Sequence, residues 1–141
     1  MQFFFHENSP DHDSLVAALW SVCEGLVYIS ETDSPVQPFV AGVTGEVTAR
    51  TILQETGKDA STPTEERDFG QFFERLTTLK DWYGDTEKAR AKKYLELQKL
   101  LEENLFDLKV IRIGNIRLDI YALGLDKDGR LTGVSTFAVE T

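Results

Sequence analysis

The sequence has few of the residues that build disulfides and metal centres. Its 141 residues include one cysteine, Cys23, and two histidines, His6 and His12. One cysteine excludes an internal disulfide and any zinc site that needs two or more cysteines, and it is typical of a reducing compartment. Both histidines lie near the start of the sequence, so we predict no metal site there. Cys23 is expected to be a buried small hydrophobe on a helix.

Basic residues and long apolar runs are also scarce. The 15 lysines and arginines are outnumbered by 24 aspartates and glutamates, which gives a net charge of −9. Nucleic acids and anionic membranes bind basic surfaces, so neither is an expected partner. No apolar run approaches the roughly 18 residues of a membrane helix, and the first residues do not resemble a signal peptide. We therefore predict a cytoplasmic protein whose charge suits a basic partner.

Catalytic motifs are missing as well. The sequence has no glycine-rich phosphate loop, no nucleophile elbow and no zinc-protease motif. Residues 126–129, Asp-Lys-Asp-Gly, begin like a calcium loop, but the glycine comes too early and Ser135 stands where a glutamate is needed. We interpret this segment as a hairpin turn. No catalytic constellation can be assembled, so we predict that the protein is not an enzyme and needs no cofactor.

The residues that are present predict one α+β domain. Helical spacing of apolar residues predicts helices at 14–24, 47–56, 69–76 and 85–105. Apolar and β-branched runs predict strands at 26–30, 39–43, 109–113, 116–125 and 131–140. The segments between them, including 31–38 with its two prolines and the polar 58–67, are predicted loops.

The last three predicted strands follow one another through short turns, which is typical of an antiparallel meander. Helices on the two faces of such a sheet would bury it. We therefore predict an α-β-α sandwich with a mainly antiparallel sheet and a C-terminal three-stranded meander. Residues 1–12 are interpreted as an N-terminal extension, and residues 13–141 as a single domain.

Two places stand out as candidate binding residues. Asp81, Trp82 and Tyr83 lie in a predicted loop, where the two rings either seal the core or form an exposed binding anchor. The last predicted strand runs to Glu140 and Thr141, which presents a carboxylate and a hydroxyl on a held chain end. Such oxygen atoms are the donors that Mg²⁺ and Ca²⁺ prefer.

A set of collinear segments runs from about Leu15 to the last residue. The segments are 28–35, 52–57, 72–73, 81–83, 110–121 and 133–141, the last of which reads Gly-Val-Ser-Thr-Phe-Ala-Val-Glu-Thr. Together they resemble the nuclease A inhibitor family. The resemblance implies an α-β-α sandwich that plugs the active site of a sugar-nonspecific DNA/RNA endonuclease of the ββα-metal type.

The resemblance also implies which residues bind the nuclease. In the family, the C-terminal threonine reaches the catalytic magnesium of the enzyme, and Thr141 matches it. A glutamate that follows a serine after the first strand approaches the same metal, and Glu31 matches that residue. Asp81 and Trp82 match the Asp-Trp-Tyr contact loop. We expect Thr141 to touch metal only in the complex, and a monomeric inhibitor to bind one nuclease.

A second interpretation stays open because a fold does not determine a function. A relative with the same fold could serve as an interaction or regulatory protein for a different basic or metal-containing partner. Inhibition of a candidate nuclease, tested with and without Thr141, separates the two interpretations.

Overall fold

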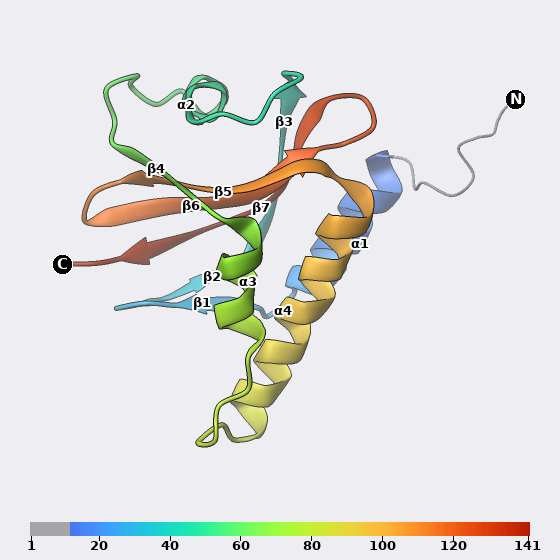
Figure 1. The fold of residues 1–141 in the computed structure, drawn as a ribbon, viewed down its shortest axis with the longest axis vertical. Helices are drawn as coiled ribbons and strands as arrows, with labels where there is room; N and C mark the ends of the chain where they lie inside the picture. The colour runs from blue at the N-terminus through green and yellow to red at the C-terminus, as the bar shows by residue number, and fades with distance from the viewer. Residues whose placement is uncertain (1–11) are drawn as a thin grey trace, which may run out of the picture.

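Residues 12–141, the part that the computed structural model describes, form four helices and two antiparallel sheets (Figure 1). The helices are α1 His12–Cys23, α2 Ala49–Thr56, α3 Phe69–Thr77 and α4 Asp85–Asn104. The strands are β1 Val27–Ile29, β2 Asp33–Pro35, β3 Gln37–Val43, β4 Thr64–Arg67, β5 Phe106–Gly114, β6 Arg117–Leu125 and β7 Arg130–Val139. The predicted extension lies outside the described residues, except for His12, which begins α1.

The larger sheet has five strands in the order β3-β7-β6-β5-β4, and β1 and β2 form a separate hairpin. All its pairings are antiparallel, so the predicted meander of β5, β6 and β7 is confirmed at its centre. Gly114 begins the first turn with a φ of 119°. A Cβ atom there would lie 2.3 Å from the Arg117 carbonyl oxygen, so the turn requires glycine.

The turn from β6 to β7 is the predicted hairpin turn. The carboxylate of Asp126 accepts hydrogen bonds from the N–H groups of Asp128 and Arg130 at 2.9 and 3.0 Å. Gly129 follows with a φ of 80°. The Asp126 carboxylate thus accepts hydrogen bonds from the backbone of its own turn, as aspartate side chains in turns commonly do.

Helices cover both faces of the five-stranded sheet (Figure 1). On one face, α1, α3 and α4 pack against alternate residues of the sheet strands, and an apolar stripe of the predicted helix at 85–105 is buried there. Its members are Tyr94, Leu97, Leu101 and Leu105. On the other face, Ile52 and Leu53 of α2 pack against Ile111 and Leu123. The predicted α-β-α arrangement is confirmed.

Two predicted loops contain strands. The segment 31–38 holds β2 and the first residues of β3, and the segment 58–67 holds β4. Both β3 and β4 are edge strands, where a proline such as Pro38 is tolerated and where charged residues are common. The two missed strands, β2 and β4, are short and polar, so neither has the apolar pattern of a central strand. The strand predicted at 26–30 is present as β1, but it is half-buried to exposed rather than buried.

Cys23 is buried at the end of α1, as predicted. Burial raises the pKa of its thiol to about 11, so it stays protonated and unreactive at neutral pH. None of the helices in residues 12–141 has the length and apolar character that a membrane span requires.

Candidate functional site

The end of β7 lies against the turn that follows β1, and these residues form the C-terminal corner (residues 30–31 and 139–141). The Val139 N–H donates to the Ser30 hydroxyl oxygen at 3.0 Å. The Glu31 N–H donates to the Val139 carbonyl oxygen at 3.4 Å. These bonds join segments that are more than a hundred residues apart in the sequence, so only the folded chain creates the corner.

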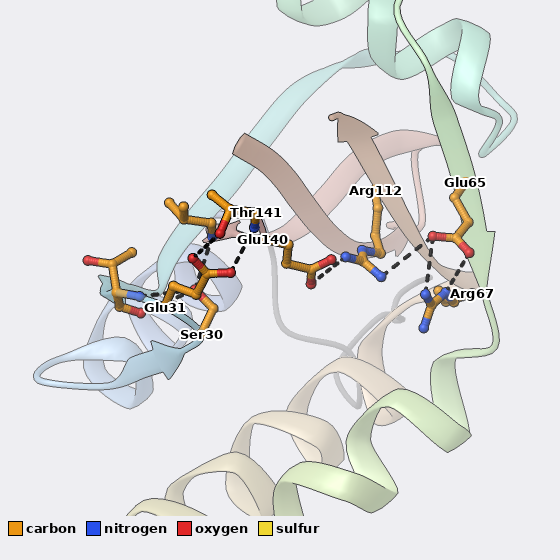
Figure 2. A network of polar contacts seen from close by, with 9 residues as sticks. Ser30, Glu31, Glu65, Arg67, Arg112, Glu140 and Thr141 are labelled. Carbon is orange, nitrogen blue, oxygen red and sulfur yellow. Dashed lines mark hydrogen bonds and ion pairs between the residues drawn. The ribbon is translucent and has the colours of Figure 1, made fainter. Parts of the chain in front are cut away.

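Glu31 and Thr141 face each other in this corner (Figure 2). The Thr141 N–H donates to Glu31 Oε2 at 2.7 Å, and the Thr141 hydroxyl donates to Glu31 Oε1 at 2.8 Å. These two bonds lower the pKa of the Glu31 carboxyl below its ordinary value. The carboxylate is therefore ionised at neutral pH, and both residues are exposed. The corner presents clustered oxygen atoms to solvent.

The hairpin that carries Glu31 is anchored to the helices beneath it. The Tyr94 hydroxyl of α4 donates to the Val27 carbonyl oxygen at 2.7 Å. The Tyr28 ring stacks on Phe72 of α3, with 5.9 Å between ring centroids and 9° between ring planes. The apolar residues at the predicted helix faces thus position the turn in which Glu31 lies.

The second candidate region is the Trp82 loop (residues 78–84), which joins α3 to α4. Trp82 is 70% exposed, so the interpretation that it seals the core is wrong, and the ring is exposed as a binding anchor requires. Tyr83 is half-buried and meets Trp82 edge to face, with 4.8 Å between centroids. Asp81 is exposed, and its carboxylate has no partner among residues 12–141.

A groove of about 220 Å³ leads from the Trp82 loop to the hairpin. Its lining includes Trp82 and Tyr83 on one side and Ile29 of β1 on the other. Ile29 is 50% exposed and precedes Glu31 on the same hairpin. The groove therefore lies between the Trp82 loop and β1, the strand that precedes Glu31. Of the four residues predicted from the sequence, Trp82 lines the groove, whereas Glu31, Asp81 and Thr141 do not.

A family model describing nuclease A inhibitor-like proteins matches residues 13–141, nearly the whole chain. The chain belongs to the nuclease A inhibitor-like family. Membership implies a protein that inhibits a nuclease and therefore binds one. A search of curated proteins found no match to the chain.

The nuclease A inhibitor-like domain also contains an ion-pair chain next to the corner that sequence analysis missed (Figure 2). Arg112 Nη2 lies 2.7 Å from Glu140 Oε2, and Arg112 Nη1 lies 3.5 Å from Glu65 Oε1. Glu65 Oε2 in turn lies 3.0 Å from Arg67 Nε. The available signal was Arg112 itself, because a buried arginine in an apolar strand needs an acidic or hydrogen-bonding partner.

The nuclease A inhibitor-like domain offers a metal only part of a coordination shell. Within residues 12–141, no three histidine, cysteine, aspartate or glutamate residues gather where they could hold an ion. Glu31 and Thr141 supply hard oxygen donors, but a Mg²⁺ ion needs about six ligands in octahedral geometry. The corner can therefore complete the shell of a metal that another molecule holds, and it does not provide a full site.

Proposed function

We propose that the protein inhibits a sugar-nonspecific DNA/RNA endonuclease of the ββα-metal type by plugging its active site. The observation that carries the proposal is the exposed pair of Glu31 and Thr141, joined by bonds of 2.7 and 2.8 Å. The protein acts as a cytoplasmic monomer, binds one nuclease and has no catalytic activity of its own. Family membership supports the general inhibitory role.

Charge brings the two proteins together. An enzyme that binds nucleic acid of any sequence must surround its substrate with basic groups. A chain of net charge −9 is attracted to such a surface, which accelerates encounter and orients it. The inhibitor thus competes with nucleic acid for the same positively charged surface of the nuclease.

Thr141 provides the metal contact in this proposal. Its hydroxyl hydrogen is donated to Glu31, so the oxygen lone pairs of Thr141 remain available to a metal ion. A hydrogen bond to a carboxylate also makes a ligand oxygen more basic, as outer partners of metal ligands do. The terminal carboxylate of a chain ending at Thr141 stands in for a phosphate oxygen and contains no bond that the enzyme can cleave. Glu31 additionally accepts hydrogen bonds from metal-bound water.

The Trp82 loop supplies the apolar part of the interface. Trp82 is exposed beside the groove, and large aromatic residues that become buried on binding dominate interface energies. Asp81, exposed next to it, adds negative charge at the rim of the same surface. Metal contact at the corner and ring burial at the loop together form a two-point attachment.

The experiment is a nuclease-protection assay on plasmid DNA at physiological salt. The protein ending at Thr141 is titrated against a ββα-metal endonuclease, beside a variant that lacks Thr141. Protection at a 1:1 ratio is expected. Loss of Thr141 is expected to weaken binding by about 2–5 kcal/mol, the scale for removing a charged partner from an interface.

The other outcomes are also decisive. Protection that survives the deletion would keep the inhibitor and discard the metal contact. Failure to protect against the endonuclease of the same cell would favour the second interpretation, in which this fold serves a different basic or metal-containing partner.

A further inference from the structure

Glu140 and Thr141 continue past the end of the five-stranded sheet. The last ladder pair between β6 and β7 joins Arg117 and Val139. The Glu140 N–H then donates to the Ile116 carbonyl oxygen at 2.8 Å. Chain ends beyond such bonds fray unless something ties them down. Side-chain contacts therefore decide where Thr141 lies.

A buried arginine holds the Glu140 side chain (Figure 2). Arg112 is 9% exposed, and its Nη2 atom donates to Glu140 Oε2 at 2.7 Å. Arg112 belongs to β5, one strand in from the sheet edge, and is paired directly with Glu65 of β4. Its second terminal nitrogen faces that Glu65 carboxylate. Strand pairing thus fixes the backbone position of Arg112, and its guanidinium contacts a second carboxylate, that of Glu65, besides Glu140.

The surroundings of Glu140 favour this one position. A pocket of about 120 Å³ is lined by Arg67, Arg75 and Arg112 together with Glu140 itself. The positive charge of these arginines attracts the Glu140 carboxylate, and the Glu65 carboxylate beside Arg67 and Arg112 offsets part of that attraction.

The ion pair is better suited to fixing a position than to adding stability. The Glu140 side chain is 53% exposed, so solvent screens its attraction to Arg112. Removing Arg112 from water costs free energy that offsets the remaining gain. The pair instead restricts where the backbone at Glu140 can lie.

We propose that Arg112 is a positioning residue for the candidate metal contact. Through Glu140 it directs residues 139–141 so that the N–H and the hydroxyl of Thr141 both reach Glu31. The inference rests on the proposed function and deepens it, because a chain end ordered before binding loses less freedom in the complex. Arg112 itself is buried and acts only through these neighbours.

The first test uses the free protein and does not depend on any nuclease. The variants are Arg112→Met and Glu140→Gln, with Glu66→Gln as the matched control because Glu66 is exposed on β4 and outside the ion-pair chain. Both carboxylates that face Arg112 are at least half exposed, so Arg112→Met leaves no buried unpaired charge. Thermal melting verifies folding.

The readout is the backbone amide of Thr141 followed by NMR. Both variants are expected to lose hydrogen-exchange protection at this amide and to shift its resonance, whereas Glu66→Gln leaves it unchanged. A Thr141 amide that keeps its shift and protection in both variants would overturn the proposal.

The second test is a double-mutant comparison in the nuclease assay. Arg112→Met is expected to weaken inhibition roughly 10- to 100-fold, as loss of a group that orients a metal ligand does. In a chain that already lacks Thr141, the same substitution should have little further effect. Equal losses in both backgrounds would show that Arg112 acts independently of Thr141. If the unmodified chain inhibits no ββα-metal endonuclease, the proposed function fails while the NMR result still decides the role of Arg112.

Discussion

The C-terminal corner and the Trp82 loop are the two candidate binding regions, and they are held in opposite ways. The corner joins Ser30 and Glu31 to the last residues of β7 through hydrogen bonds between distant segments. The loop is held locally: the Tyr83 N–H donates to the Lys80 carbonyl oxygen, and Gly84 is bonded to Glu87 at the start of α4. One region therefore depends on the whole fold, and the other on its own short sequence.

The difference assigns the two regions different tasks. The corner is polar and ordered by charge-assisted bonds, which suits a contact that must meet a metal ion within a fraction of an ångström. The loop exposes an aromatic ring, which suits burial of apolar surface with looser geometric demands. Burial of apolar surface is expected from the loop, and the metal contact and the orientation of the complex from the corner. The following variants test that division.

Trp82→Ala is expected to weaken inhibition more than any other point substitution in the loop or the corner. Removing a central interface tryptophan costs about 2 kcal/mol of binding or more. Melting should stay unchanged, because the ring is 70% exposed. Trp20 is 59% exposed on α1, so Trp20→Ala is the matched control and should leave inhibition intact. A lower melting temperature with unchanged inhibition would show that Trp82 stabilises the fold and does not bind the nuclease.

Thr141→Val tests the hydroxyl while keeping the terminal carboxylate. The valine cannot donate to Glu31 or offer an oxygen to the metal, so binding should weaken about tenfold, the scale for losing a hydrogen bond to a charged group. Thr141→Ser keeps the hydroxyl and should retain inhibition. The comparison is made by titrating the nuclease with each variant. Equal inhibition by all three chains would leave only the carboxylate as the metal contact.

The corner should also open at acid pH. The bonds from Thr141 lower the pKa of Glu31 below its ordinary value of 4.5. Their contribution is thus fully present above that ordinary value and is lost as the pH falls through the lower, folded-state pKa. An NMR titration of the Glu31 carboxyl carbon should give a midpoint below 4.5, and deletion of Thr141 should raise it. A midpoint insensitive to the deletion would contradict the pairing.

Asp81→Asn is expected to have the smallest effect. Its carboxylate is exposed next to Trp82 in the loop, so the substitution should slow association modestly at low salt and hardly at high salt. Glu103→Gln makes the same change of charge at an exposed position of α4. It should leave the association rate nearly unchanged. Stopped-flow association at two ionic strengths provides the measurement. A large loss at high salt would place Asp81 in a buried contact instead.

The sequence predicted the parts of the fold that have apolar periodicity. The four helices, the meander and the hairpin turn at Asp126 were predicted, because burial and turn geometry leave local signals. The strands β2 and β4 were missed, since they are short and polar and depend on pairing with distant partners. Local pattern does not encode such pairing.

The candidate site divides in the same way. Trp82 was found from its sequence neighbours, but its exposure followed only from the packing of α3 and α4. The family resemblance pointed to Glu31 and Thr141, but not to the bonds that join them. Arg112 was missed because its partners, Glu65 on β4 and Glu140 just beyond β7, are distant from it in the sequence. Side-chain pairs across the sheet are tertiary information.

The two edges of the five-stranded sheet have a further consequence. One edge strand, β3, contains Pro38, and the other, β4, carries Glu65, Glu66 and Arg67. Proline and charged side chains discourage an incoming strand from pairing with an open edge. Self-association by strand addition is therefore disfavoured at both edges. At high concentration this sheet should resist the edge-to-edge stacking from which fibrils grow.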